Sequence, residues 1–109
     1  MSCIFCKIIK EEIPAEVVFQ DDDILVFKDV TPVAPTHLLF IPKLHLDSLT
    51  KGEDQPELMQ KLLITIIKVA KRYDLSDYRV VTNIGPEGGQ TVSHLHFHLL
   101  SGRQMRAMG

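Results

Sequence analysis

Three histidines, His94, His96 and His98, alternate with apolar residues in the stretch GGQTVSHLHFHLL, which spans residues 88–100. Successive side chains of a β-strand point to opposite faces of its sheet, so the alternation predicts a strand with three imidazoles on one face. Same-face neighbours lie roughly 6.5–7 Å apart, which makes one metal ion held by all three strained. Imidazole is a covalent nucleophile, and its pKa of about 6.5 leaves much of it neutral at pH 7. The alternative is a half-buried strand whose polar face merely tolerates histidine.

The two cysteines, Cys3 and Cys6, form a C-x-x-C motif that fits a redox pair, a disulfide or half of a zinc site. A thioredoxin-like pair follows a strand, for which the two residues before Cys3 leave no room, and a reducing cytoplasm disfavours a disulfide. A tetrahedral zinc site needs two further ligands. The meaning of the motif therefore depends on the nitrogen donors of the chain, which are His37, His45, His94, His96 and His98.

The composition is that of an ordinary globular protein, with 45% hydrophobic and 24% charged residues. At 109 residues the chain is expected to form a single domain over residues 1–109. Its 12 Lys and Arg against 14 Asp and Glu give a net charge of -2, which argues against a nucleic-acid partner. The chain has no basic region followed by a long apolar stretch and no membrane-length apolar segment, so we expect a cytoplasmic protein without a membrane partner.

The first half of the chain predicts a short helix followed by strands. Ser2 is placed to cap a helix over residues 3–10, and Pro14 forces an extended exit from it. Residues 17–19 and 24–28 are strand-like and flank the acidic turn 21–23, which indicates a hairpin. A loop with two prolines over residues 31–35 leads to a buried strand over 37–41 that ends at Pro42.

The second half predicts one long helix and the remaining strands. Residues 54–73 have apolar positions at helical spacing, with Asp54 and Glu57 as a capping box and Pro56 in the first turn. Residues 78–83 and the histidine segment read as strands, separated by a glycine-rich turn over 85–89. We therefore expect an α+β fold with a mostly antiparallel sheet of about five strands, one long helix and one short helix. The helical apolar positions expected in the core are Met59, Leu62, Leu63, Ile66, Val69, Ala70 and Tyr73.

Several ordered segments resemble one protein family. The H-x-H-x-H segment is similar to the signature of the histidine-triad (HIT) nucleotide-binding proteins. The segments CIFCKII (3–9), EIP (12–14), DVTP (29–32), APTH (34–37), IPK (41–43), GGQ (88–90) and GRQM (102–105) resemble the Hint branch along nearly the whole chain. The resemblance implies a HIT-like fold and hydrolysis of a purine nucleoside phosphoramidate, of the AMP-lysine type, through a nucleotidyl-histidine intermediate. The alternatives are a diadenosine-polyphosphate hydrolase of a related branch and a nucleotide- or zinc-binding module with little activity.

The same resemblance assigns catalytic roles. His96 is the expected nucleophile, and it needs a partner for its other ring nitrogen, which in the family is a backbone carbonyl. His98 is expected to contact phosphate oxygens and to position the leaving group. Thr91 stands where the Hint branch has a serine and can assist proton delivery to the departing amine. His37 fits the family's additional active-site histidine.

A nucleoside site is expected on the strand over 24–28. Phe27 and Asp29 share a face by strand parity, and Asp29 matches the family's ribose-binding aspartate. Gly88 and Gly89 allow the backbone to approach a phosphate, while Asn83 and Gln90 offer neutral donors. The residues expected to surround the purine base are Phe5, Ile8, Ile13, Phe27, Val30 and Leu39.

Family members with C-x-x-C complete a zinc site with two histidines, which implies Cys3, Cys6, His45 and His94 as ligands here. The zinc is expected to be structural, and catalysis is expected to need no metal. The resemblance also implies a homodimer, whose sheets join edge to edge with the long helices packing across the two-fold axis. One departure concerns the tail, which ends RAMG (106–109) where Hint relatives often have a tryptophan-containing segment that shapes the leaving-group pocket.

Overall fold

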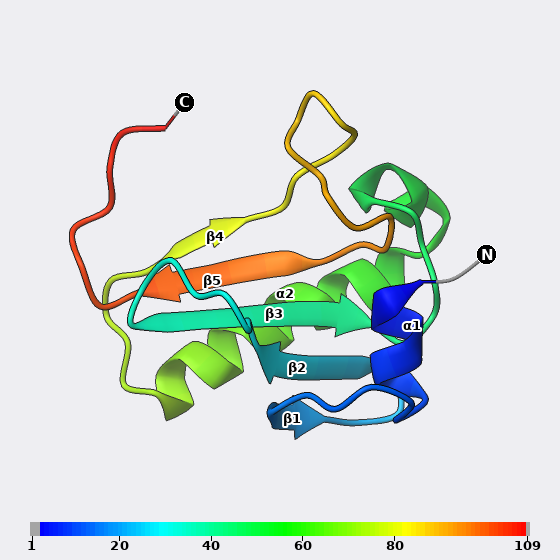
Figure 1. Ribbon diagram of the computed structural model, residues 1–109, viewed down its shortest axis with the longest axis horizontal. Helices are drawn as coiled ribbons and strands as arrows, with labels where there is room; N and C mark the ends of the chain where they lie inside the picture. The colour runs from blue at the N-terminus through cyan, green and yellow to red at the C-terminus, as the bar shows by residue number, and fades with distance from the viewer. Residues whose placement is uncertain (1–2, 109) are drawn as a thin grey trace.

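The computed structural model describes residues 3–108 as a five-stranded antiparallel sheet with a helix on each face (Figure 1). The strand order is β1-β2-β3-β5-β4. The predicted α+β fold, with five strands, one long helix and one short helix, is confirmed. The elements are α1 (Ile4–Ile9), β1 (Val17–Gln20), β2 (Ile24–Lys28), β3 (Thr36–Pro42), the 3-10 helix η1 (Leu49–Asp54), α2 (Pro56–Arg72), β4 (Arg79–Val81) and β5 (Phe97–Ser101).

The two faces of the sheet are covered to different extents. Along β3, Leu38 and Phe40 point towards α2, while Leu39 and Ile41 point to the opposite face, which α1 covers only in part (Figure 1). The α2 face holds the larger apolar core, built on Ile24, Val26, Leu62, Ile66, Val69 and Leu99. Because α1 is six residues long, part of the other face remains available for a site.

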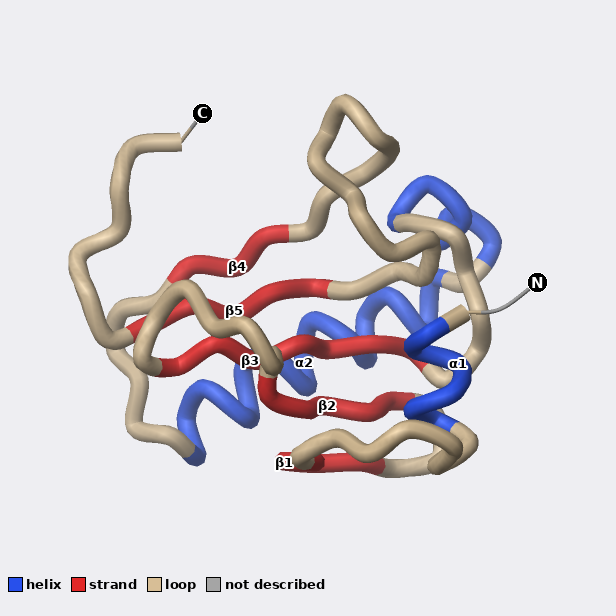
Figure 2. The backbone as a smooth tube through the Cα atoms, in the orientation of Figure 1, coloured by secondary structure: helices blue, strands red, loops and turns tan. Residues whose placement is uncertain are grey.

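The histidine segment alternates as predicted, but it is not a strand throughout. Leu95, Phe97 and Leu99 all enter the α2 core, whereas regular pairing with β3 begins only at Phe97. The prediction that His94 and His96 lie in a strand is wrong. The physical reason is that the Leu95 N–H donates to the carbonyl of Leu46 at 2.7 Å. The backbone at Leu95 therefore pairs with the segment that follows β3 rather than with β3 itself, and Figure 2 shows the long loop between β4 and β5 that ends there.

Both helix starts differ from the sequence expectation. The predicted cap Ser2 lies outside the described residues, and Cys3 occupies the N-cap position of α1, its Sγ accepting the Cys6 N–H at 3.4 Å. The predicted Asp54–Glu57 capping box is wrong, because Asp54 ends η1 and α2 begins at Pro56 without a side-chain cap. The helix η1 has its own N-cap in Ser48, whose hydroxyl accepts the Thr50 N–H at 3.3 Å.

One flank of α2 is apolar but uncovered. Leu63 was expected in the core, yet it is 51% exposed, and Ile67, one helical turn further on, is exposed beside it. On the opposite flank Lys61 binds Asp21 and Asp23 at the β1–β2 turn, so Leu63 and Ile67 lie on the flank away from that turn. Among residues 3–108, no helix has the length and apolar character needed to cross a bilayer.

Candidate active site and candidate metal site

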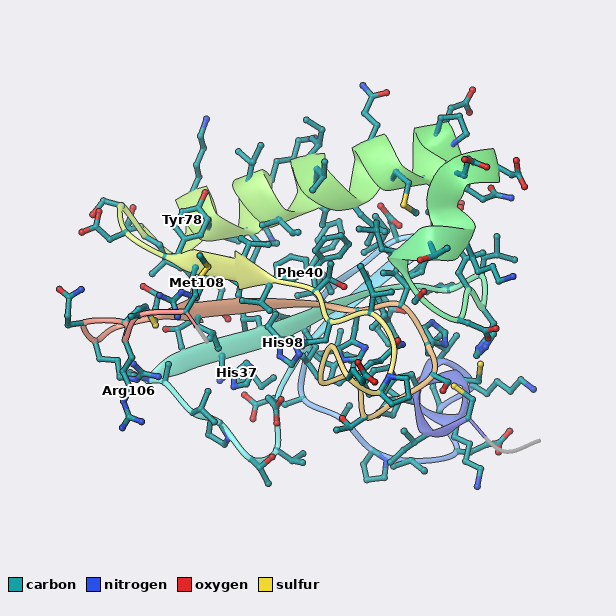
Figure 3. The ribbon with its side chains drawn as sticks, turned by 90° about the horizontal axis from the view of Figure 1, so that it is seen from above. His37, Phe40, Tyr78, His98, Arg106 and Met108 are labelled. Atoms are coloured by element: carbon teal, nitrogen blue, oxygen red, sulfur yellow. The ribbon has the colours of Figure 1, made fainter. Side chains whose placement is uncertain are left out.

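Two of the predicted catalytic histidines meet on the face of the sheet opposite α2. His37 comes from β3 and His98 from the neighbouring strand β5, in the register that pairs Leu39 with His98. His37 Nε2 and His98 Nδ1 are 2.9 Å apart. Figure 3 shows the two imidazoles side by side, whereas Phe40 of β3 lies towards α2.

Hydrogen bonds fix which ring nitrogens of this pair carry hydrogen. The backbone N–H of Val33 donates to His37 Nδ1 at 3.1 Å, so a neutral His37 carries its hydrogen on Nε2. That hydrogen can be donated to His98 Nδ1, which places the hydrogen of a neutral His98 on its own Nε2. Burial lowers the pKa of both side chains, that of His98 to about 4. Both imidazoles are therefore neutral at pH 7.

In His96 the hydrogen is on Nδ1 and the lone pair is on Nε2, which is the reverse of the arrangement in His37 and His98. Its ring is buried, and Nδ1 lies 2.7 Å from the carbonyl oxygen of His94. A carbonyl only accepts, so Nδ1 carries the hydrogen and Nε2 keeps its lone pair. The rings of His96 and His98 have centroids 5.0 Å apart. A nucleophilic nitrogen and an N–H donor thus stand next to each other.

The neutral His98 predicts a pH-dependent stability. Its pKa is about 4 when folded and about 6.5 when unfolded, so the unfolded chain binds more protons between these values and stability falls as the pH drops through this window. The expected loss from His98 is about 3 kcal/mol from pH 6.5 to pH 4, at about 1.4 kcal/mol per pKa unit. Urea unfolding of the wild type and of His98→Gln isolates this contribution, because the variant retains every other titrating group. Equal losses of stability in the two proteins would contradict it.

Asp29 lies directly after β2 and faces the same pair. Its backbone N–H donates to the carbonyl of His37 at 3.0 Å. The Thr31 N–H and hydroxyl donate to Asp29 Oδ1 at 2.8 and 3.2 Å, which holds the carboxylate in one orientation. The other oxygen, Oδ2, is 3.3 Å from His37 Nε2. No supporting role was predicted for Thr31 or Val33, because loop geometry brings them there.

The residues expected around a purine base are only partly gathered. Phe5, Phe27 and Leu39 are buried in one cluster against which Ile8 packs, and the Phe5 ring lies 5.1 Å from that of His96. Ile13 is half-buried outside this cluster, and Val30 is 88% exposed. The buried aromatic and aliphatic wall therefore comes from α1, β2 and β3.

The glycine-rich turn is held by internal bonds. Gln90 accepts the Gly85 N–H and donates to the carbonyls of Asp47 and Val92, while Asn83 donates to the carbonyl of Gly88. The amides of Gly88 and Gly89 donate within the turn. The side chains of Asn83 and Gln90 thus shape the loop, and the positive φ of 91° at Gly89 favours glycine there.

Thr91 follows this turn and is exposed. It lines a hollow of about 630 Å³ together with Val92 and Ser93. Cys3, Cys6 and His45 also line this hollow. This hollow lies between the loop expected to face the leaving group and the predicted metal ligands.

The four predicted zinc ligands, Cys3, Cys6, His45 and His94, converge with their donor atoms within 4.8 Å of one another. His94 Nδ1 lies 3.5 Å from Cys3 Sγ and 3.6 Å from Cys6 Sγ, and the Nδ1 atoms of the two histidines are 3.1 Å apart. Tetrahedral zinc with ordinary bond lengths places two nitrogens about 3.3 Å apart and a nitrogen and a sulfur about 3.6 Å apart. The donor set therefore fits zinc.

Second partners orient both histidine ligands. His94 Nε2 donates to the carbonyl of Pro42 at 2.8 Å, and His45 Nε2 lies 3.0 Å from Asp47 Oδ1. Each Nδ1 therefore keeps a lone pair. Because the two lone pairs face each other, both nitrogens can bind one cation placed between them. Burial and the neighbouring Cys3 raise the pKa of the Cys6 thiol, so a dication is also what would stabilise two thiolates. Asp47 was not among the predicted site residues, although its position two residues after His45 was a usable signal.

Comparison of the chain with known proteins identifies its family. The chain is 52% identical to "14 kDa zinc-binding protein" of Zea mays, over 94% of this chain and 83% of the relative. It is 48% identical to "Adenylylsulfatase HINT1" of Arabidopsis thaliana, over 94% and 72%. The crystal structure of a HIT family hydrolase from Legionella pneumophila is 50% identical, with a TM-score of 0.92 over 96% of each chain. The HIT domain model matches residues 10–105, and the chain belongs to the HIT family.

Proposed function

We propose that this protein hydrolyses the bond between the α-phosphorus of a purine nucleoside monophosphate and an amine, through a nucleotidyl-His96 intermediate. The main support is that two neighbouring imidazoles have complementary ring nitrogens, a lone pair on His96 and an N–H on His98. His96 has its Nε2 lone pair fixed by the Nδ1–H bond to the His94 carbonyl, and the neighbouring His98 has an Nε2–H to donate. Nucleophilic attack with proton delivery to the departing group needs both.

The proposed reaction has two steps. His98 takes up a second proton when the anionic phosphate is bound. His96 Nε2 then attacks the α-phosphorus, the P–N bond breaks, and the amine leaves with the Nε2 proton of His98, so that His98 becomes neutral, with Thr91 able to assist. Water then attacks the nucleotidyl-His96, His98 Nε2 takes a proton from that water, and the P–N bond to His96 breaks to release the monophosphate. The sum is phosphoramidate plus water giving monophosphate plus amine, with both histidines restored.

The nucleoside is expected to lie against the buried wall of Phe5, Phe27 and Leu39, with its ribose on Asp29. The carboxylate of Asp29 is half-buried and already oriented by Thr31, so two ribose hydroxyls can donate to it at little cost in side-chain entropy. We propose AMP, GMP or a similar purine nucleotide as the ligand. The chemistry requires no metal at the phosphate. The zinc expected at Cys3, Cys6, His45 and His94 would act structurally, by closing the N-terminal segment onto the loop before β5.

The relative named as an adenylylsulfatase favours a second candidate substrate, adenylyl sulfate, and a diadenosine polyphosphate is a third. All three substrates suit attack on an α-phosphorus, but they differ in the leaving group. An amine must gain a proton to depart, whereas sulfate and ADP leave as stable anions. Proton donation by His98 therefore favours the amine.

The test compares release of AMP from an AMP-lysine analogue, adenylyl sulfate and diadenosine triphosphate. We expect kcat/KM for the AMP-lysine analogue to exceed that for diadenosine triphosphate at least about tenfold. His98→Ala should slow hydrolysis of the P–N substrate by about 10²-fold or more, as loss of a general acid does, and affect adenylyl sulfate less. Fastest hydrolysis of diadenosine triphosphate, or an equal effect of His98→Ala on all substrates, would refute the amine assignment.

We also propose that the protein is a homodimer. The strand β4 forms a sheet edge on which Val80 is exposed, as is Tyr78 just before the strand, and α2 exposes Leu63 and Ile67. An open sheet edge beside apolar helix residues is a surface that a second copy covers well. Sedimentation equilibrium at micromolar concentration should give twice the mass of one chain, and a Leu63→Lys Ile67→Lys variant should give a single chain mass. A wild-type mass of one chain would show the proposal to be wrong.

A further inference from the structure

The side-chain amide of Gln90 joins two loops. Its Oε1 accepts the Gly85 N–H at 2.9 Å, and its Nε2 donates to the carbonyl oxygens of Val92 at 2.9 Å and of Asp47 at 2.6 Å. A backbone N–H only donates and a carbonyl only accepts, so these partners fix the orientation of the amide. The amide therefore ties the glycine-rich turn over 85–89 to the segment that follows β3.

Asp47 continues this connection to the predicted metal site. Its carboxylate oxygen Oδ1 lies 3.0 Å from Nε2 of His45, one of the four predicted zinc ligands. With a metal ion on Nδ1 of His45, the ring hydrogen is on Nε2, and the Asp47 carboxylate accepts it. The backbone carbonyl of Asp47 accepts from Gln90. A continuous series of hydrogen bonds therefore runs from a metal ligand through Asp47 and Gln90 to the turn.

Gln90 is also the polar tether of the loop that bears Thr91. Within residues 3–108, its bond to Asp47 is the one hydrogen bond that joins residues 84–93 to a part of the chain outside the β4–β5 connection. The amides of Gly88 and Gly89 donate within the turn, so they hold its shape but not its place. The bond from Gln90 to Asp47 therefore helps to fix where Thr91 stands relative to the sheet.

We propose that Gln90 is a positioning residue that couples the metal site to the loop bearing Thr91. A bound cation holds His45, His45 holds Asp47, and Asp47 holds Gln90. Because His45 is exposed, it is free to turn away from Asp47 once the cation is lost, and the loop then gains freedom. The proposal rests on the proposed function for the role of Thr91 in the reaction, whereas the coupling itself is a property of the hydrogen bonds.

The nucleophile is shielded from this effect. His94, whose carbonyl lies 2.7 Å from Nδ1 of His96, is fully buried, and its Nε2 donates to the carbonyl of Pro42 at 2.8 Å. These contacts do not involve a cation, so His94 keeps its place when the metal is lost. Loss of the metal is therefore expected to slow the reaction through the loop, but not to abolish it.

Nitrogen-15 relaxation observes the loop without turnover. Backbone order parameters of Gly88, Gly89 and Thr91 are measured in the zinc-loaded protein and in protein stripped with chelator. In the wild type we expect values of about 0.85 with zinc, typical of rigid backbone, and a fall towards about 0.6 without it. In Gln90→Met the values should be near the lower figure in both states. Loop order that ignores zinc in the wild type, or that responds equally in Gln90→Met, would overturn the proposal.

Reciprocity provides a second test. If zinc orders the loop through Gln90, an intact Gln90 must favour zinc binding by the same factor. Competition with a fluorescent chelator should show zinc bound about tenfold more weakly by Gln90→Met, the size expected for one hydrogen bond. Gln90→Glu retains an acceptor for the Gly85 N–H but loses the donor to Asp47, so it should resemble Gln90→Met. Glu87→Gln, at an exposed position of the same turn, should bind zinc like the wild type. Equal affinities in all four proteins would refute the coupling.

The kinetic test separates kcat from KM with the AMP-lysine analogue. Removal of zinc should lower the wild-type kcat about tenfold and leave KM within about threefold, because Asp29 and the apolar wall are unchanged. Gln90→Met should have the lower kcat with or without zinc, since the two changes act through one bond. A kcat that falls by the same factor in both proteins would show that the effect bypasses Gln90.

The two proposals fail in different ways. Loop order that depends on zinc and Gln90, in a protein that turns over no phosphoramidate, would refute the proposed function alone. Normal turnover with loop order independent of zinc would refute the coupling alone, and reduced wild type that binds no zinc would also overturn it. Melting temperatures of Gln90→Met, Gln90→Glu and the stripped wild type establish that each is folded at the temperature of the measurements.

Discussion

His96→Ala should lose at least about a thousandfold in kcat, because removing a covalent nucleophile deletes the step that every later step depends on. The same variant should bind AMP with a Kd within about threefold of the wild type, because Asp29 and the buried Phe5 and Phe27 wall are unchanged. Single-turnover kinetics and calorimetric titration with AMP measure the two quantities separately. A His96→Ala protein that retains a tenth of the wild-type rate, in a preparation free of contaminating hydrolases, would exclude His96 as the nucleophile.

Two further variants control for indirect effects of this change. His96→Gly with added imidazole should recover part of the turnover, since free imidazole can occupy the vacated space and attack in place of the side chain. Asp29→Asn should show the opposite profile, with weaker ribonucleotide binding and a smaller loss in kcat. If both variants lost binding and turnover in proportion, a general disturbance of the site would explain the His96→Ala result instead.

Cys3→Ala Cys6→Ala should lose its zinc and melt roughly 10 °C or more below the wild type. A ligand present at about 1,000 times its Kd contributes about 4 kcal/mol, and 1 kcal/mol shifts the melting temperature of a domain of this size by about 4–8 °C. The wild type stripped with chelator should melt close to the double variant, because both lack the same cation. Metal analysis and thermal denaturation of reduced protein provide the measurements.

Ser93→Ala is the matched control for the zinc variant. Ser93 is exposed and lines the same hollow as the two cysteines, so its removal should leave about one zinc per chain and an unchanged melting temperature. Reduced wild-type protein without zinc, or a double variant as stable as the wild type, would contradict the assignment of the four ligands.

Sequence pattern predicted the layers of this fold because both faces of the sheet follow simple alternation. Leu38 and Phe40 were placed in the core with their strand, and the period-two pattern separated Leu95 and Phe97 from the histidines correctly. The same pattern could not locate the start of β5, which depends on a bond between Leu95 and the distant residue Leu46. Contacts far apart in sequence leave no trace in local periodicity.

The site residues were found for a different reason, which is that their types have few roles in chemistry. The alternating spacing indicated His98, and the resemblance to the histidine-triad family indicated His37 and His45. The supporting bonds from Val33 and Thr31 were invisible because they arise from loop conformation. Leu63 shows a second limit. An apolar helix position looks the same in sequence whether it faces a core or an exposed surface.

The central claim, a covalent nucleotidyl-His96 intermediate, is tested most directly by the stereochemical course at phosphorus. An adenosine phosphorothioamidate of one configuration, hydrolysed in water enriched in oxygen-18, gives a chiral product whose configuration can be determined. Attack by His96 Nε2 followed by attack of water inverts the phosphorus twice, so the account predicts net retention. Net inversion would mean that water attacks the α-phosphorus directly, and would contradict the account.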